Sequence, residues 1–295
     1  STIAESVEDN GSYSWTIPST YSADSTYKIR ISNVANASVY DESNDYFILL
    51  PEEYMPGCTD SYASNYDSSA NVDDGSCEYD TTEGLVAYYP FNGNAQDESG
   101  NENHGEIHGA KLAQDRHGRV DAAFEFGGSK DYIEVQNASN LSNFDSVAIS
   151  CWIKMNVEEA KGTEGVVTKW WQGPRGDLYA IFVGGHRIET GSYHYTQNDG
   201  IFSNPITSND WQFAVFVHDG KIGGSLYLNG QLVGHRAVAG AIPSYDNVLR
   251  IGAGNDEGRV WRFFKGSIDD VRIYNRALSA EEVKALYDLE KPKDE

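Results

Sequence analysis

Residues 268–277 read Ile-Asp-Asp-Val-Arg-Ile-Tyr-Asn-Arg-Ala and place a carboxylate where a strand pattern demands an apolar side chain. Val271 and Ile273 alternate, which predicts a β-strand with one buried face. Asp269 has the parity of both, whereas Asp270 has the solvent-facing parity. Because an unpaired carboxylate in a core is costly, Asp269 predicts an ion pair or a bound metal ion.

A second group of oxygen-bearing side chains lies upstream, where residues 97–101 read Asp-Glu-Ser-Gly-Asn. Hard cations prefer such ligands, so the two stretches together predict one calcium ion joining the start of a domain to its end. Two alternatives stay open. Asp97 is also a common turn residue, and Asp269 has Arg272 and Arg276 nearby in sequence as ion-pair partners.

Composition narrows the class of protein. The 295 residues include 45 acidic and 22 basic side chains, a formal charge of −23. Such a chain repels phosphate backbones, which argues against a nucleic-acid partner. The charge fits solubility and also divalent-cation sites. No run of eighteen apolar residues exists, so we expect no membrane insertion. Helical periodicity is nearly absent before residue 279, which predicts an all-β chain.

Three cysteines bear on the compartment. Cys151 has the parity of the apolar residues in an alternating stretch, 147–153, so we expect a buried thiol. Cys58 and Cys77 then pair by elimination, which indicates an extracellular protein, either secreted or displayed on a cell surface. A metal site using both thiols is the alternative, but no second Cys-x-x-Cys or histidine pair accompanies them.

Residues 1–51 predict a small β unit with strands at 13–17, 27–31 and 46–50. The strings at 10–15, 27–31 and 45–48 resemble the C-terminal half of an immunoglobulin-like repeat of fungal GPI-anchored and bacterial surface proteins. The resemblance implies a partial unit, because the first strands of the family are missing. Residues 52–56 form a linker.

Residues 57–79 form an acidic segment with oxygen-bearing side chains at alternate positions, as in loops that wrap calcium. These are Asn65, Asp67, Ser69, Asn71 and Asp73. The segment closely resembles a short repeat of Bacteroidetes-type surface proteins, with a GCTD start and a DDGSCEY end, and is similar to thrombospondin type 3 repeats. The resemblance implies a calcium site. The alternative is a disulfide-stapled spacer without an ion.

Residues 83–290 predict the main domain. Strand-like runs recur at the spacing of a β-sandwich, and Asn229-Gly230 indicates a tight hairpin. One short C-terminal helix follows Ser279, which forms a capping box with Glu282, and residues 291–295 are a tail. The predicted strands are 85–91, 122–126, 132–135, 147–155, 165–170, 179–183, 212–218, 224–228, 249–251 and 267–274.

This domain resembles the laminin-G-like, concanavalin-type jelly roll. The matching strings lie at 84–95, 97–101, 124–126, 132–135, 150–154, 226–230 and 266–279. The resemblance implies a calcium ion held by Asp97, Asn101 and Asp269, with backbone carbonyls completing the shell. Such an ion would clamp the terminal strands together.

Aromatic side chains near polar or Gly-rich loops suggest a carbohydrate site, because sugars stack their C–H faces on such rings. The candidate ligand-binding residues are Trp170, Trp171, Arg175, Tyr193, Tyr195 and Trp261. The alternative is structural, since aromatic residues also fill sandwich cores and form cross-strand pairs.

Catalysis is not expected. Retaining glycosidases with this jelly roll carry two carboxylates on one strand, as in Glu-x-Asp-x-Glu, and no strand here has that spacing. The function that the sequence favours is calcium-stabilised adhesion or glycan recognition on a bacterial surface. Two alternatives remain. One is a structural subunit of a stalk or filament, assembled with neighbouring subunits through residues 1–51. The other is an accessory module of a larger secreted hydrolase.

Overall fold

The computed structural model describes residues 26–33, 35–48, 54–136, 138–157, 162–169, 179–192, 200–237, 240–241, 248–256 and 259–292. The chain divides into two compact units, Ser1–Glu78 and Tyr79–Glu295, and each is treated by itself. The strand predicted at 13–17 lies outside the described residues. Within them, no helix has the length and apolar character needed to cross a membrane.

The first unit contains short antiparallel pairs. Strand β1 (Thr26–Tyr27) pairs with β4 (Phe47–Ile48), and β2 (Arg30–Ser32) pairs with β3 (Tyr40–Glu42). The one strand predicted at 27–31 overlaps both β1 and β2, and β4 lies within the predicted 46–50, whereas β3 was not predicted. Large apolar side chains on this ribbon are exposed, including Ile31, Tyr40 and Tyr46. These strand pairs therefore bury little apolar surface of their own.

The acidic segment closes through the predicted disulfide. Cys58 and Cys77 are bonded, with their Cα atoms 4.7 Å apart. Strands β5 (Pro56–Gly57) and β6 (Val72–Asp73) pair in parallel beside the bridge. Cys151 is a buried free thiol in the other unit, as predicted. The elimination argument for the cysteines is thus confirmed.

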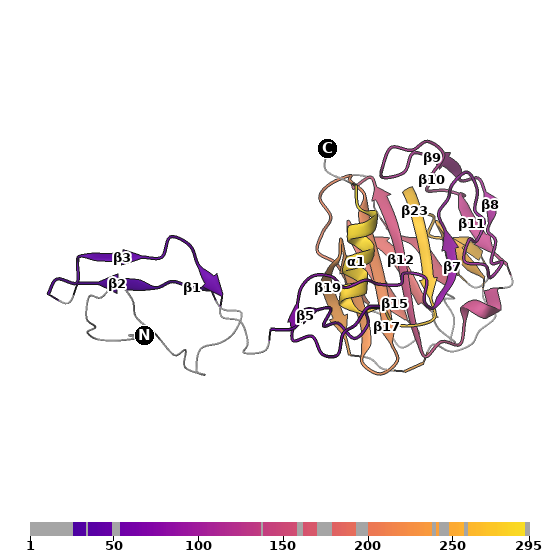
Figure 1. Cartoon of the computed structure of the whole chain (residues 1–295). Coiled ribbons are helices and arrows are strands. Elements are labelled where there is room, and N and C mark those ends of the chain that lie inside the picture. The colour runs from indigo at the N-terminus through magenta and orange to yellow at the C-terminus, as the bar shows by residue number, and fades with distance from the viewer. Residues whose placement is uncertain are drawn as a thin grey trace. The chain divides into compact units, whose positions relative to one another are not determined.

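The second unit is a sandwich of two antiparallel sheets (Figure 1). Among the described residues, the first sheet runs in the order β19-β18-β17-β12-β23-β10-β9, and β7 pairs with the second half of β23. The strands are β19 (Gln231–Arg236), β18 (Gly223–Leu228), β17 (Gln212–Asp219), β12 (Ser146–Met155), β23 (Lys265–Tyr274), β10 (Ala123–Gly127), β9 (Lys111–Ala113) and β7 (Leu85–Tyr89).

The second sheet runs in the order β16-β15-β14-β13-β20-β11-β8 over the part of the chain that is described. Its strands are β16 (Ile201–Phe202), β15 (Arg187–Ser192), β14 (Tyr179–Gly184), β13 (Thr163–Lys169), β20 (Leu249–Ile251), β11 (Tyr132–Val135) and β8 (Glu106–His108). The β21–β22 hairpin (Gly254–Asp256 and Arg259–Trp261) follows β20.

The main core lies between the sheets. Alternate residues of the central strands fill it, such as Ile149, Cys151 and Ile153 of β12 and Ile181 of β14. The predicted tight turn is present, because Asn229 and Gly230 have φ of 51° and 77°. Two successive left-handed residues are what a two-residue hairpin of this kind requires. The all-β sandwich predicted from the sequence is confirmed.

Helix α1 (Ala280–Glu290) covers the outer face of the first sheet (Figure 1). Its capping box is formed as predicted, since Ser279 accepts from the backbone of Glu282 and Glu282 accepts from the backbone of Ser279. Val283 and Leu286 pack on sheet residues that include Trp152 and Phe213. The first sheet is thus buried on both faces.

A β-bulge in β23 changes the side on which Asp269 lies. Trp152 pairs with Asp269 but Ser150 pairs with Arg272, so β23 carries one extra residue there, and Asp270 has φ of 46°. Ile268 and Val271 therefore both face the core. Asp269 shares the outer, helix-covered side with Arg272. The parity argument for Asp269 was wrong for this reason, and Asp270, predicted to be exposed, is buried.

Candidate functional site

The structure describes only one of the six residues predicted to bind a ligand. Trp170, Trp171, Arg175, Tyr193 and Tyr195 lie outside the described residues. Trp261 ends β22, and 47% of its surface is exposed. The Trp261 ring is thus available to a ligand.

The backbone holds the segment after β22 close to β13. The amide of Gly165 donates to the carbonyl of Arg262 over 2.7 Å. A Cβ at Gly165 would lie 2.5 Å from the carbonyl carbon of Ala253, so only glycine fits this close approach. The position of Trp261 is therefore fixed relative to the second sheet.

Arg262 connects Trp261 to the outer face of the second sheet. Its guanidinium carbon lies 5.8 Å from the Trp261 ring centroid and 5.6 Å from that of Phe182. Phe182 faces outward, because its neighbours Ile181 and Val183 on β14 belong to the core. The guanidinium thus lies between an exposed ring and a ring of the sheet, at cation–π distance from both.

Two further strands extend this arrangement. Phe182 pairs with Glu189 on β15, and Glu189 pairs with Phe202 on β16. Phe202 is 43% exposed. Burial raises the pKa of the Glu189 carboxyl, and the positive charge of Arg262 opposes that shift. We call Trp261, Arg262, Phe182, Glu189 and Phe202 the aromatic row.

The aromatic row combines exposed rings with one hydrogen-bond donor group and one acceptor group. Aromatic faces bind apolar C–H surfaces, and the charged pair offers directional hydrogen bonds. A ligand with both apolar and hydroxyl surface, such as a sugar, matches this combination.

Elsewhere on this outer face, described side chains of β20, β11 and β8 contact one another. Arg250 on β20 makes an ion pair with Glu134 on β11, with Nη2 and Oε2 2.6 Å apart. The rings of His108 and Tyr132 stack with centroids 4.4 Å apart. These contacts join β20, β11 and β8, so we assign them to sheet stability.

Asp97 and Asn101, two of the predicted calcium ligands of the sandwich, have hydrogen-bond partners within their own loop and the adjoining strand. Asp97 is buried, and its carboxylate accepts from the backbone amides of Tyr88, Ser99 and Asn103, each 2.9 Å away. Burial raises the pKa of Asp97, but these backbone hydrogen bonds outweigh burial, so the pKa lies below its usual value. Asn101 is exposed and bonds Ser99. Asp97 therefore organises a turn, which is the alternative given above.

Asp269 belongs to a different cluster, the buried charge network. Arg116 reaches it, with Nη1 and Oδ2 2.5 Å apart, and also pairs with Asp270 over 2.7 Å. Arg272 pairs with Glu290 over 2.5 Å. Burial and then the neighbouring Asp270 raise the pKa of Asp269 to about 8, although Arg116 opposes the shift. Asp269 therefore has a charged partner, as the ion-pair alternative expects, but the partner is Arg116 in place of Arg272 or Arg276, and the raised pKa means that Asp269 holds a proton up to about pH 8.

Further contacts close the network. The Trp152 indole donates to Glu290 over 2.8 Å, and the Tyr88 hydroxyl donates to Asp270 over 2.8 Å. The guanidinium carbon of Arg272 lies 4.2 Å from the Tyr88 ring centroid. Asp97 and Asp269 thus have separate sets of hydrogen-bond and ion-pair partners, and a calcium ion shared by Asp97, Asn101 and Asp269 stays a prediction. No group of three or more His, Cys, Asp or Glu side chains in the described ranges has the arrangement of a metal site.

Oxygens of the acidic segment accept hydrogen bonds from its own chain. Asn65 accepts from the amide of Glu78, Asp67 from that of Ser69, and Asp73 from that of Gly75. Asn71 accepts from the amide of Met55 and Ser69 donates to Asp67. The bonds of Asp67 and Asp73 are Asx-type turns, whereas those of Asn65 and Asn71 join parts of the chain that are 13 and 16 residues apart. Calcium binding here stays a prediction.

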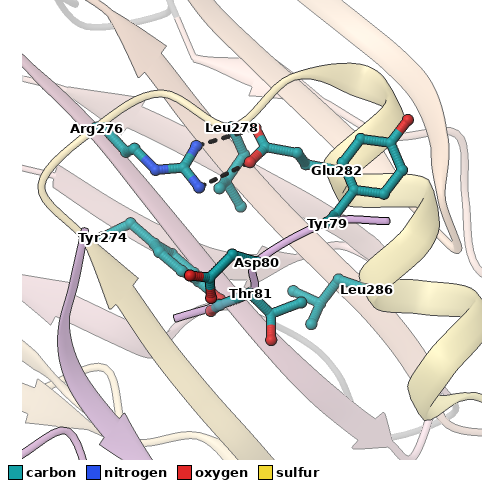
Figure 2. Close-up of a pocket in the computed structure, with 8 residues that line it drawn as sticks. All are labelled: Tyr79, Asp80, Thr81, Tyr274, Arg276, Leu278, Glu282 and Leu286. Carbon is teal, nitrogen blue, oxygen red and sulfur yellow. Dashed lines mark hydrogen bonds and ion pairs between the residues drawn. The ribbon is translucent and has the colours of Figure 1, made fainter. Parts of the chain in front are cut away.

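A shallow pocket in the second unit lies between helix α1 and the segment that leads into β7 (Figure 2). Figure 2 shows Arg276 directed at Glu282, and Nη2 and Oε1 are 2.7 Å apart. The Tyr274 hydroxyl donates to the carbonyl of Thr81 over 3.0 Å. Because these lining groups bind one another, we assign the pocket to the attachment of the helix.

Residues 126–284 match the concanavalin A-like lectin/glucanases superfamily. This match covers more than half of the chain, so the protein belongs to that superfamily. No curated protein matches the chain. The resemblance predicted for the main domain is therefore confirmed, whereas those of the first unit stay predictions.

Solved structures share the fold at low identity. The receptor binding domain of a botulinum neurotoxin C/D mosaic serotype matches with TM-score 0.55 and 16% identity, over 71% of this chain and 52% of that one. A mutant sialidase of Trypanosoma rangeli that displays trans-sialidase activity matches with TM-score 0.55 and 18% identity, over 72% and 34%. This chain thus spans about half of the toxin domain.

Domain 4 of an extracellular arabinanase from Geobacillus stearothermophilus, in complex with arabinotriose, is matched almost completely. Its TM-score is 0.50 and its identity 21%, over 69% of this chain and 98% of that domain. At such identities the likeness shows the fold alone.

Sequence reasoning missed most of the aromatic row. Glu189 and Phe202 lie on strands that were not predicted, and only strand pairing brings them beside Phe182. Arg116, the centre of the buried charge network, carried no signal because its partners are more than 150 residues away. Glu290, another member of the network, is the last residue of the predicted helix.

Proposed function

We propose that this chain is a non-catalytic, extracellular carbohydrate-binding module whose ligand lies on the aromatic row. The observation that carries the proposal is the exposed Trp261 ring, held beside the guanidinium of Arg262 on the open face of the second sheet. Trp261 does not stand alone on this face, because Arg262 and a second exposed ring, Phe202, belong to the same row, and such a group suits a ligand with apolar and hydroxyl surface.

Membership of the superfamily supports the proposal, and so do two similar structures that contain a bound sugar. One is a botulinum neurotoxin binding domain in complex with SialylT, and the other is the arabinanase domain with arabinotriose. The arabinanase domain also favours the accessory-module alternative, because that domain is part of a hydrolase. A free-standing binding module and an accessory module of a hydrolase would use the same kind of carbohydrate site.

A binding role without chemistry fits the carboxylates of the open face. Glu134 is paired with Arg250, and Glu189 lies on another strand. Retaining hydrolysis needs two carboxyl groups about 5 Å apart, one of them protonated. The sequence has no strand with the Glu-x-Asp-x-Glu spacing that supplies such a pair in this fold.

The Cys58–Cys77 disulfide supports an extracellular setting, because cytosolic thiols are kept reduced. Adhesion to a glycosylated surface is one use of such a module. Calcium stabilisation of the acidic segment is a separate proposal. A rise in its resistance to protease with calcium, reversed by EDTA, would support it, and equal resistance would contradict it.

A glycan array that includes marine and plant polysaccharides, run in calcium and repeated in EDTA, tests the proposal. We expect selective binding that Trp261→Ala lowers at least tenfold, about 1.4 kcal/mol. Ile222→Ala is the matched control, since Ile222 is also an exposed apolar residue but lies between β17 and β18 of the other sheet. Absence of binding to every glycan would contradict the proposal.

A second candidate function is assembly through the first unit, favoured by its exposed Ile31, Tyr40 and Tyr46. Exposed apolar side chains on short strands are typical of a surface that pairs with another chain. Light scattering across a concentration series tests it. Concentration-dependent dimers or filaments support assembly, and a monomer at all concentrations contradicts it.

A further inference from the structure

We infer that the aromatic row binds an internal run of several neutral sugar units, and not a single terminal sugar. The inference rests on the proposed function and adds the ligand class and two residues, Glu189 and Phe202, to the site. It follows from the length, the polarity and the charge of the row.

The length of the row exceeds one sugar ring. Phe182, Glu189 and Phe202 lie on three adjacent strands. Neighbouring strands are about 4.8 Å apart, so Phe202 is roughly 10 Å from Phe182. On the other side, the Arg262 guanidinium lies 5.6 Å from the Phe182 ring and 5.8 Å from the Trp261 ring. The two exposed rings, Trp261 and Phe202, are therefore separate platforms for different sugar units.

The middle of the row offers the hydrogen-bonding groups that a sugar chain needs. Arg262 donates and Glu189 accepts, whereas a hydroxyl group both accepts and donates. The Phe182 ring, which is buried with 8% of its surface exposed, lies between them in the row. A hydroxyl-bearing unit that lies between the two exposed rings can thus add hydrogen bonds to both charged groups.

Phe202 keeps exposed surface at its end of the row. Gly200 precedes β16, and a Cβ there would lie 3.1 Å from a Glu189 carboxylate oxygen and 3.3 Å from the Phe202 ring. Glycine therefore leaves these two side chains uncovered. β16 ends the sheet among the described strands, so the site does not require a chain end at this position.

Charge favours a neutral ligand. The positive charge of Arg262 and the negative charge of Glu189 cancel within the row. The row therefore has no excess positive charge to bind the carboxylate of a uronic or sialic acid. The chain as a whole has a formal charge of −23. That charge repels anionic polysaccharides at low ionic strength.

Isothermal titration with neutral oligosaccharide ladders tests the inference. The probes are arabino-, cello- and manno-oligosaccharides of two to six units, with sialyllactose as the anionic, terminal probe. We expect affinity for one ladder to rise at least tenfold from two units to six. Phe202→Ala should remove most of this gain and leave the affinity for two units unchanged, whereas Ile222→Ala should leave both unchanged.

The outcomes separate the inference from the proposed function. Affinity that is independent of length, or binding of sialyllactose and of no neutral ladder, overturns the inference and leaves carbohydrate binding intact. Equal loss at all lengths on Phe202→Ala also overturns it, because Phe202 would then not be a separate platform. Absence of binding to all of these probes, together with an empty glycan array, would overturn both.

Discussion

The two sheets of the sandwich differ in what lies on their outer faces. Helix α1 covers the first sheet, and beneath the end of the helix Arg116, Asp269 and Glu290 are almost completely buried. The second sheet carries the aromatic row, where Trp261 and Phe202 remain exposed. Both faces hold charged and aromatic side chains, but on the covered face these side chains are buried, whereas on the open face two of the rings keep exposed surface.

The difference separates stability from recognition. A buried ion cluster whose members are all paired holds strands and helix in one arrangement, and breaking it leaves an uncompensated charge. Exposed rings contribute little to folding. Variants in the covered face should therefore change stability, and variants in the open face should change binding.

The largest effect is expected for Arg116→Met. Only 4% of the Arg116 side chain is exposed, and the change leaves Asp269 and Asp270 without their closest cation. We expect the free energy of unfolding to fall by about 3–5 kcal/mol. Denaturant unfolding followed by tryptophan fluorescence measures it.

Arg119→Met is the matched control, three residues away. Arg119 pairs with Asp115, but 58% of its side chain is exposed. Such a surface pair contributes about 0–1 kcal/mol. Equal losses for the two variants would contradict the importance of the buried charge network.

The next effect is a dependence of stability on pH. Burial and then the neighbouring Asp270 and Asp115 raise the pKa of the Asp269 carboxyl from its usual 3.8 to about 8, although Arg116 opposes the shift. Between these values the folded state holds a proton that the unfolded state has released. Stability from this group is therefore complete below the unfolded pKa and is lost as pH rises through 8, at up to about 1.4 kcal/mol per pH unit.

Asp269→Asn tests this dependence, because asparagine resembles the protonated carboxyl at every pH. We expect the variant to gain stability relative to the parent chain as pH rises from 5 to about 8. Urea midpoints over that range measure the difference. A difference that does not change with pH would show that Asp269 is ionised throughout.

A smaller effect is expected for Ser279→Ala, which removes the N-cap of the covering helix. The Ser279 hydroxyl accepts from the amide of Glu282, and the loss of a cap costs about 1 kcal/mol. Ser279→Asp retains an acceptor and should retain most of the stability. Equal stability of the alanine variant would mean that packing alone holds α1.

Much of the fold was predictable because its strands alternate clearly. The predicted runs at 132–135 and 249–251 agree with β11 and β20, and the capping box fixed the start of α1. Short strands such as β16 and β22 have too few residues for a period to show. The site was less predictable, because cross-strand pairing brings Phe202 to Glu189.

The bulge in β23 explains why Asp269 lies on the opposite face from the one that strand alternation predicts. Side chains alternate strictly only in a regular strand, and the extra residue near Asp270 moves Asp269 to the other face. The sequence correctly indicated that Asp269 needs a charged partner. It could not indicate Arg116, which the loop after β9 supplies from far along the chain.

The most direct test of the division between the two faces is to measure unfolding and glycan affinity together for Trp261→Ala. We expect the free energy of unfolding of this variant to stay within about 0.5 kcal/mol of that of the parent chain. We also expect at least a tenfold loss of affinity for the glycan that the array selects. Unchanged affinity, or a loss of stability that accounts for the loss of binding, would contradict this division.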